Sequence, residues 1–375
     1  MRMVYILYTS VLAALTFFSY LFIDPNLFYL HTLYSDFTFQ HRTFTTILYG
    51  ICIILFFVFY LLFLRLASKK LLDIQKIKLL INMTMGVLFF SYPAMLSFDI
   101  FNYIATAKVL SFYQENPYII MPIEFIGDPL LDFMHAANKI ALYGPAWIIL
   151  SLVPYSLSFG NFIFTLFTFK LFIVIFYLAT VFLIWKMTKN HFSVAFFALN
   201  PLVVIETLIS GHNDIVMMFF ALVSFYFLRQ KRILLGTVFI IISILIKYAT
   251  IFLLPVFIYA LWKVFWRQKI NWEKIFYFSA LLMMTAFFLS PIREEIYPWY
   301  ATWFLAFAAL VPSKKVLLYT CIAFSFGFLF RYVPFMLFGT YLGITPIFKL
   351  VVTWIPPFLV LLYYGATQIV EKYKK

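Results

Sequence analysis

Residues 45–64 read TTILYGICIILFFVFYLLFL, and residues 162–185 read FIFTLFTFKLFIVIFYLATVFLIW. Each run is long enough to cross a hydrocarbon core of roughly 30 Å as a helix, since a helix rises about 1.5 Å per residue. The whole chain is of the same character: 65% of its residues are hydrophobic and 11% are charged, with a mean hydropathy of +1.00. Soluble domains contain about 25% charged residues. The sequence therefore predicts an integral membrane protein.

The apolar runs also decide between the two classes of membrane protein. Strands of a membrane barrel alternate apolar and polar residues, whereas these runs are apolar on every face. The net charge of +14 does not indicate a nucleic-acid-binding protein, because the basic residues occur in short turns between apolar runs and form no dense basic face. Cys52 and Cys321 both lie inside apolar runs, so no disulfide framework is expected. We expect an all-α, polytopic transmembrane bundle without a nucleic-acid partner.

Basic turns set the expected orientation, because Lys and Arg accumulate in cytoplasmic loops. They are Arg2, residues 65–78, Lys186 and Lys189, residues 229–232, residues 263–274, Lys314 and Lys315, and residues 372–375. Both termini are then cytoplasmic in the cell membrane, with about twelve crossings. One integral membrane domain, 1–375, is expected, with N-terminal helices over 1–97, an outer loop over 98–160 and a helical bundle over 161–375. Residues 143–157 are expected to lie at the outer interface or to be re-entrant, and the outer loop is expected to contain at least two juxtamembrane helices.

Asp99 lies just after an apolar span, where hydrocarbon meets water. Ser97 can cap a helix whose first turn contains Asp99, and the helix dipole favours a carboxylate there. Tyr103 follows four residues later and shares the same helix face. A carboxylate at such a boundary can act as a base toward a substrate from either phase. The alternative is an acid that only begins a helix at the interface.

A second polar group follows Gly211 at the expected outer end of a span. His212, Asn213 and Asp214 must face water or protein rather than lipid, and Glu206 lies about one and a half turns earlier. A solvated turn would explain the first three. Glu206 favours a cavity, because an acid inside a membrane helix usually faces one. The spacing matches no zinc geometry, so no metal site is predicted, although a divalent metal is not excluded.

Two cations, Lys247 and Arg331, lie in apolar stretches near the outer side. Arg293 and Lys139 could join them from outer loops. A buried cation pairs with an acid or binds an anion, and snorkelling of the side chain to the interface is the alternative. Together with the acids, these cations suggest an outer cavity that suits an amphipathic lipid phosphate.

Seven short motifs carry a resemblance to a known family. They are Asp99-Ile-Phe-Asn-Tyr103, Asn116-Pro117-Tyr118, Tyr143-Gly-Pro145, Asn200-Pro201-Leu202, Gly211-His-Asn-Asp214, Lys247 with Leu254-Pro255, and Tyr297-Pro-Trp-Tyr300. In these motifs and their order, over 98–300, the chain resembles the GT-C superfamily of polytopic glycosyltransferases. It most resembles the bacterial and archaeal mannosyltransferases that use polyprenyl-phosphate sugars. Three spans precede the Asp99 loop, where the simplest family pattern has one.

The resemblance implies a function and the roles of several residues. Asp99 would be the catalytic base of an inverting single displacement that moves a sugar, preferably mannose, from a polyprenyl-phosphate donor to a glycan, lipid or protein acceptor at the outer face. No cofactor is implied. Lys247, Arg293 or Arg331 would bind the donor phosphate. The expected substrate-binding residues are Tyr103, Glu206, His212, Asn213 and Asp214.

Two other classes of protein remain as alternatives. A transporter or flippase for lipid-linked saccharides would also need an aromatic cavity with buried charges, but many transporters have internal repeats and place essential charges near mid-membrane. This sequence shows no convincing repeat, and its polar residues gather at one expected face. A structural subunit of an envelope assembly would leave Asp99, Lys247 and Arg331 without a purpose.

Overall fold

The chain folds into a bundle of helices, described by a computed structural model over residues 2–22, 37–292 and 295–373. All the regular secondary structure in these ranges is helical, which confirms the predicted all-α class. Apart from the α-helices there are several short 3₁₀ helices and one π-helical segment, Ile205–Ile209. The protein is a multi-pass membrane protein, as its long apolar helices indicate.

Seven helical segments within the described ranges are long and apolar enough to cross a membrane. They are α1 (Arg2–Ser19), α4 (Arg42–Ser68), α8 (Phe162–Thr188), Tyr248–Phe265 with α13 (Leu254–Phe265), Trp272–Ile292 with α14 (Trp272–Leu289), Lys315–Phe338 with α16 (Lys315–Phe330) and α17 (Val333–Phe338), and Thr345–Thr367 within α18 (Thr345–Tyr373). An eighth crossing results if α9 (His191–Ala198) and the segment Pro201–Ile209, which begins with α10 (Pro201–Val204), form one span bent by 53°.

The expectation of about twelve crossings is therefore wrong for the described residues. Several apolar stretches between the basic turns form helices of only 12 to 16 residues: α5 (Ile74–Leu88), α7 (Pro145–Ser156), α11 (Asp214–Arg229) and α12 (Ile233–Ile246). Such helices extend roughly 18–24 Å, which is short of a hydrocarbon core of about 30 Å. The apolar composition predicted these helices correctly, but each helix is too short to count as a membrane crossing.

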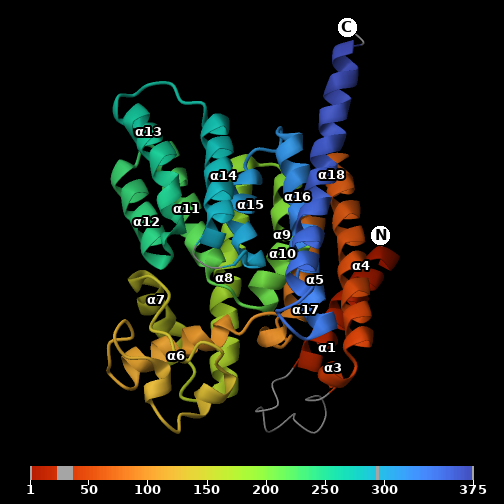
Figure 1. Ribbon diagram of the computed structural model, residues 1–375. Helices are drawn as coiled ribbons and strands as arrows, with labels where there is room; N and C mark the ends of the chain where they lie inside the picture. The colour runs from red at the N-terminus through yellow and green to blue at the C-terminus, as the bar shows by residue number, and fades with distance from the viewer. Residues whose placement is uncertain (1, 23–36, 293–294, 374–375) are drawn as a thin grey trace.

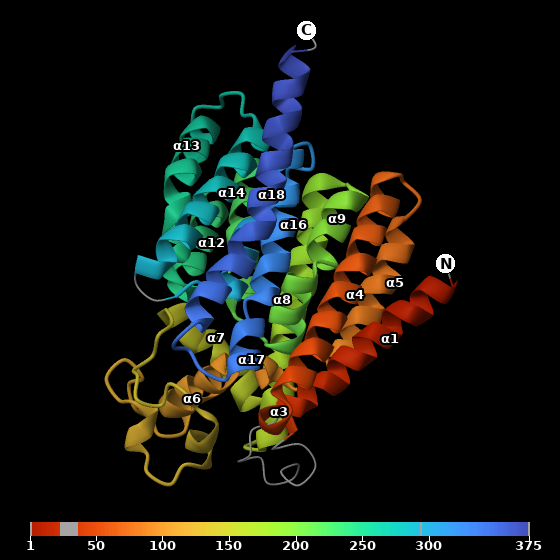
Figure 2. The ribbon, with the colours of Figure 1, turned by 45° about the vertical axis from the view of Figure 1, so that its right-hand side comes forward.

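The two ends of the bundle differ. At the lower end in Figure 1, α6 (Asp99–Ser111) lies across the bundle, with α7 and the short helices η3 (Pro122–Glu124) and η4 (Pro129–Phe133) around it. At the upper end lie the C-terminal turns of α18 and the connection between α13 and α14 (Figure 1), together with the connection between α4 and α5 (Figure 2). The basic turns at 65–78 and 263–274 therefore lie at the end away from α6.

One stretch of chain lies at the centre of the bundle. Every residue from 193 to 218 is buried, through α9, α10, the π-helical segment and the start of α11. Asn200 lies in this stretch, directly before α10. Its side chain accepts the backbone N–H of Leu202 at 3.0 Å and donates to the Ser325 hydroxyl at 3.1 Å. Glu206 and residues 212–214 belong to this stretch, so the polar residues singled out in the sequence lie in the bundle interior.

Gly144 joins the lower-end helices to the bundle. Its N–H donates to the carbonyl oxygen of Ile246 at 3.1 Å, so the start of α7 is attached to the end of α12, directly before Lys247. A Cβ atom at Gly144 would lie 2.0 Å from the carbonyl oxygen of Leu245. Only glycine allows this close approach between the two backbones.

Gly144→Ala should therefore destabilise the protein, by roughly 1–3 kcal/mol, because the added methyl group must push two backbones apart. Thermal unfolding of the purified protein in detergent measures the effect as a lower Tm. Gly86→Ala is the matched control, since nothing lies within 4 Å of a Cβ at this position inside α5. An unchanged Tm for Gly144→Ala would contradict the described contact.

Candidate functional site

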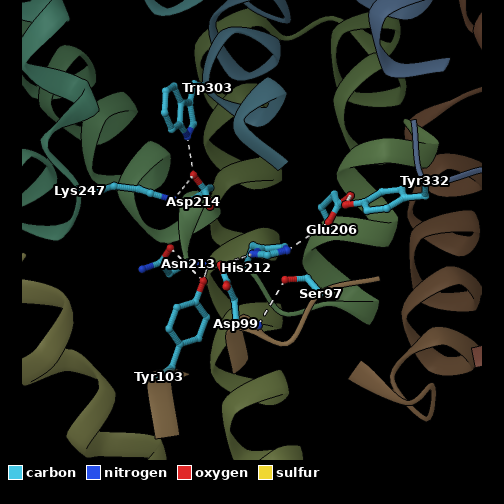
Figure 3. A network of polar contacts seen from close by, with 10 residues as sticks. All are labelled: Ser97, Asp99, Tyr103, Glu206, His212, Asn213, Asp214, Lys247, Trp303 and Tyr332. Carbon is cyan, nitrogen blue, oxygen red and sulfur yellow. Dashed lines mark hydrogen bonds and ion pairs between the residues drawn. The ribbon is translucent and has the colours of Figure 1, made fainter. Parts of the chain in front are cut away.

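Asp99 is the first residue of α6, at the point where the chain leaves the bundle. The Ser97 hydroxyl accepts the backbone N–H of Asp99 at 3.3 Å, but Phe98 occupies the N-cap position of α6 and no side chain caps this helix, so the expectation that Ser97 caps it is wrong. The Asp99 side chain is 26% exposed, whereas the polar groups behind it are buried. Asp99 is thus more exposed than His212 and Glu206, which lie behind it in the polar network drawn in Figure 3.

Behind Asp99 lies the imidazole of His212. Its Nδ1 is 3.5 Å from Asp99 Oδ2, and its Nε2 is 3.3 Å from Glu206 Oε2. The ring also stacks on the indole of Trp299, with ring centroids 4.1 Å apart and planes 15° apart. Gly211, with a φ of +70°, provides the left-handed turn that directs the chain toward this position. A single imidazole therefore connects two carboxylates.

Glu206 lies on the opposite side of the His212 ring from Asp99. It lies in the π-helical segment Ile205–Ile209, and its side chain is 0% exposed. Its Oε1 accepts a hydrogen bond from the Tyr332 hydroxyl at 2.9 Å. Single π-helical turns occur frequently at functional sites, because the wider turn redirects a side chain. Figure 3 shows the resulting line of Asp99, His212, Glu206 and Tyr332 across the interior.

The charges along this line stabilise one another. Burial disfavours a charged imidazole, but contacts with Asp99 and Glu206 outweigh it and raise the pKa of His212 from 6.5 to about 9. Burial likewise opposes ionisation of Asp99, yet the adjacent His212 and the charge of Lys247 hold the pKa of Asp99 below its ordinary value. At neutral pH, Asp99 is therefore a carboxylate and His212 an imidazolium.

Tyr103 and Asn213 fasten α6 to the interior. The Tyr103 hydroxyl donates to Asn213 Oδ1 and accepts the backbone N–H of Asn213, each at 3.3 Å. The rings of Tyr143 and Trp147 pack edge-on against Tyr103, with centroids 4.8 and 5.0 Å away. This hydroxyl, one turn after Asp99, fixes the start of α6 beside residues 212–214.

Asp214 and Lys247 form a second ion pair next to the first group. Lys247 Nζ donates to the two carboxylate oxygens of Asp214 at 2.9 and 3.1 Å. The indole N–H of Trp303 donates to Asp214 Oδ1, and the Lys247 ammonium lies 4.5 Å from the ring centroid of Tyr300. Asp214 is 1% exposed but Lys247 is 17% exposed, so the cation retains access to the outside of the pair. Figure 3 shows this group above Asn213 and His212.

Arg331 does not belong to this network. Its guanidinium donates to Glu295 Oε1 at 2.7 Å and to the carbonyl oxygen of Ile296 at 3.1 Å. Lys349 donates to the same Glu295 oxygen at 3.0 Å. Arg331 thus connects the end of α16 to the segment at 295–296 and to α18. Arg293 lies outside the described residues.

Three aromatic residues of the network were not identified as site residues from the sequence. Trp299 stacks on His212, Trp303 binds Asp214 and Tyr332 binds Glu206. A signal was available for two of them. Trp299 lies in the motif Tyr297-Pro-Trp-Tyr300, and Trp303 follows it at a spacing of four, which places both on one face of a helix. Nothing in the local sequence distinguishes Tyr332 from the other tyrosines.

Within residues 2–22, 37–292 and 295–373, no group of three His, Cys, Asp or Glu side chains has the arrangement needed to hold a metal ion. The imidazole of His212 lies between two carboxylates in a line, with each nitrogen facing a different acid. This arrangement suits transfer or orientation of a proton rather than convergence on one ion.

The chain matches one family model, described as "MptA_B_family: Alpha-(1->6)-mannopyranosyltransferase, N-terminal domain", over residues 9–263. The matched part contains Asp99, Tyr103, Glu206, residues 212–214 and Lys247, and it ends before Trp299 and Tyr332. No curated protein and no solved structure matches the chain.

The His212 imidazole should titrate with a midpoint of about pH 9, well above its ordinary value, because two carboxylates face it. Since the folded-state pKa exceeds that of the unfolded chain, the charged imidazole stabilises the fold fully below about pH 6.5, and this stabilisation is lost as the pH rises through about 9. NMR of protein labelled with ¹⁵N-histidine measures the midpoint, and His212→Gln identifies the signal.

Glu206→Gln should lower that midpoint, because one of the two carboxylates becomes neutral. A midpoint at or below 6.5 in the unmodified protein would contradict the described pairing.

Proposed function

We propose, since this chain belongs to the MptA_B family of alpha-(1->6)-mannopyranosyltransferases, that it moves mannose from a polyprenyl-phosphate donor to an acceptor hydroxyl, with Asp99 as the base. The family consists of hexosyltransferases, so a sugar donor and an acceptor are its substrates. The linkage in the family description further suggests that the acceptor is a glycan or glycolipid that presents the primary hydroxyl of a hexose.

The observation that carries this proposal is the setting of Asp99. Its carboxylate is partly exposed, held at the start of α6, and backed by an imidazolium that keeps it ionised. In the proposed step, Asp99 takes the proton from the acceptor hydroxyl while that oxygen attacks the anomeric carbon of the donor. The bond from the anomeric carbon to the phosphate oxygen breaks, and its electron pair leaves with the lipid phosphate. A single displacement inverts the anomeric centre.

Glu206 and His212 support this base from behind. We expected both to bind substrate directly, but Glu206 is fully buried and its oxygens face Tyr332 and His212. This favours a positioning role: Glu206 holds His212 charged, and His212 orients the Asp99 carboxylate. Asn213 and Tyr103, which fasten α6, would keep Asp99 at a constant distance from the bound sugar.

Lys247 is the best candidate to bind the departing phosphate. Its ammonium has three N–H donors, two of which are used by Asp214, and its side chain is partly exposed. A charge-assisted hydrogen bond to the phosphate would stabilise the charge that develops as the bond breaks. Arg331 is engaged by Glu295, and its contacts do not favour a role in phosphate binding.

The distribution of basic turns supports an orientation in the membrane. The turns at 65–78 and 263–274 lie at the end of the bundle away from α6 (Figures 1 and 2). If Lys and Arg mark the cytoplasmic side, the C-terminus is cytoplasmic and Asp99 faces the extracytoplasmic side of the cell membrane. A lipid-linked donor would then place its tail in the bilayer and its sugar beside α6.

Asp99→Asn should reduce mannose transfer by about 10²- to 10⁴-fold, which is the usual contribution of a general base, because an amide cannot take the proton. The assay uses purified protein in detergent with radiolabelled polyprenyl-phosphate mannose, and it measures label in a simple mannoside and in water. Glu115→Gln is the control, since Glu115 is an exposed acid beyond the end of α6. Substantial activity in Asp99→Asn would refute the assignment of the base. Donor binding without turnover in the unmodified protein would favour a carrier of lipid-linked sugars.

Lys247→Met should raise the KM for the donor by roughly tenfold or more, because a charge-assisted hydrogen bond is lost. This variant also leaves Asp214 buried without its cation, so the double variant Lys247→Met with Asp214→Asn removes the pair together. Lys247→Arg keeps the charge and should retain most of the donor affinity. A donor KM that stays normal in the double variant would mean that Lys247 serves only the fold.

A further inference from the structure

Four helices are followed by a lysine or arginine in the left-handed backbone conformation. Each of these residues lies one or two positions beyond the last residue of α4, α8, α11 or α13, and its side chain is exposed. Residues other than glycine rarely adopt a positive φ, because their Cβ atom crowds the backbone. The four residues, which we call the left-handed cations, are Lys70 (φ +59°), Lys189 (φ +51°), Lys231 (φ +63°) and Arg267 (φ +50°).

Glycine is the residue usually found at this position after a helix, because it adopts the left-handed conformation without strain. After α4, α11 and α13 the turn closes as it does in the common glycine-terminated ending, through backbone hydrogen bonds of 2.9 Å from Leu71 to Leu66, from Arg232 to Phe227 and from Gln268 to Lys263. The described glycines with a positive φ lie in the outer segment 98–160, in the interior or between α17 and α18, and they are Gly127, Gly160, Gly211, Gly339 and Gly343. Cations therefore stand where glycine would be the easier residue.

All four left-handed cations lie at the end of the bundle away from α6, which we call the basic end. The turns after α4 and α13 lie there in Figures 1 and 2. The turns after α8 and α11 are adjacent to each other, because the Arg229 guanidinium donates to the carbonyl oxygen of Met187 at 3.1 Å. α9, which follows α8, packs beside α4 and α5 (Figure 2). The four cations therefore share one end of the molecule.

The helix dipoles do not account for the left-handed cations. A cation in the last turn stabilises the carboxyl end of a helix, and this effect is confined to that turn. Each of the four helices already has such a cation in its last turn, and these are Arg65, Lys186, Arg229 and Lys263. A charge needed only for orientation in the membrane could occupy any position of a turn, as Lys69, Arg232 and Lys269 do. The strained positions therefore need another explanation.

Aromatic side chains surround the left-handed cations. The Lys189 ammonium lies 5.3 Å from the ring centroid of Trp185. Trp266, directly before Arg267, is 61% exposed, and Trp262 one turn earlier is 48% exposed. Exposed tryptophans are typical of the headgroup level of a membrane. The basic end therefore presents its cations at the depth of the lipid phosphates.

We propose that the left-handed cations bind the phosphate headgroups of acidic phospholipids in the adjacent leaflet. Each Lys or Arg close to a membrane surface adds to the attraction for anionic lipids. Charge-assisted hydrogen bonds to a phosphate would offset the strain of the left-handed backbone. The proposal concerns the end of the molecule away from Asp99 and does not depend on the transferase function.

Glycine at all four positions separates backbone strain from lipid binding. The variant Lys70→Gly, Lys189→Gly, Lys231→Gly and Arg267→Gly should have a Tm in phosphatidylcholine nanodiscs at least equal to that of the unmodified protein, because glycine relieves the strain. Phosphatidylglycerol, mixed in equal parts with phosphatidylcholine, should raise the Tm of the unmodified protein by roughly 3 °C or more. The glycine variant should lose most of this rise. The reaction of the buried Cys52 and Cys321 with a fluorogenic maleimide measures the Tm.

Two further variants serve as matched controls. Lys70→Arg, Lys189→Arg, Lys231→Arg and Arg267→Lys together keep every charge and should keep the rise. Lys69→Gln, Lys78→Gln, Arg232→Gln and Lys269→Gln together remove four other charges of the basic end and should keep most of it.

Three results would overturn the proposal. The first is a rise in Tm that is absent from the unmodified protein or equal in the glycine variant, which would leave another partner, such as an acidic protein, for the basic end. The second is a lower Tm of the glycine variant in phosphatidylcholine alone, which would mean that the four cations serve the helix ends. The third is an equal loss of the rise in the Gln control, which would mean that net charge alone attracts the lipid.

Discussion

A carboxylate buried in an apolar helical bundle loses its hydration, and the loss is tolerated only where a cation and hydrogen-bond donors replace the water. Glu206 and Asp214 meet this requirement in two different ways. His212 and Tyr332 surround Glu206, whereas Lys247 and Trp303 surround Asp214. These contacts join the π-helical segment, the start of α11, the segment before α13, α15 (Thr302–Ala308) and the connection between α16 and α17 at one place. The position of Asp99 depends on this pairing, because its closest cation is the imidazole that Glu206 holds from the other side.

The sequence predicted which residues belong to this network better than it predicted which of them contact one another. Asp99, Tyr103, residues 212–214 and Lys247 were identified because a polar side chain in an apolar membrane protein needs a reason to be there. Their pairing could not be predicted, because it depends on how each helix is rotated. α12, for example, carries no charged residue between Ile233 and Ile246, so charge does not indicate which of its faces meets the interior. The partners of Arg331 could not be predicted either. They are Glu295 and Ile296, and they lie in a segment whose sequence has no helical periodicity to indicate where its side chains point.

The fold class followed from composition, whereas the number of crossings did not. Apolar runs predict helices reliably, since the backbone in a membrane must satisfy its own hydrogen bonds. Counting each apolar run as one crossing assumes that each helix is long enough to cross the membrane. α11 and α12 have only 16 and 14 residues, which is too short. The bend of 53° between α9 and the segment after Pro201 has a local cause, because Asn200 and Pro201 interrupt the helix there. This break brings the π-helical segment and Glu206 to the centre of the bundle.

The sequence distance between the two halves of the network affects how the protein is made. Tyr103 and Asn213 are 110 residues apart, so at 5–20 residues per second α6 emerges from the ribosome roughly 6–20 s before its partner exists. During this interval Asp99 has neither His212 nor Lys247 beside it, and a bare carboxylate is stable only in water. Because α6 lies across the end of the bundle, it can remain at the aqueous surface until its partners are made. A membrane-spanning helix with the same acid would hold an unpaired carboxylate in the hydrocarbon during this interval. The placement of α6 therefore also suits the order in which a membrane insertion machinery receives this chain.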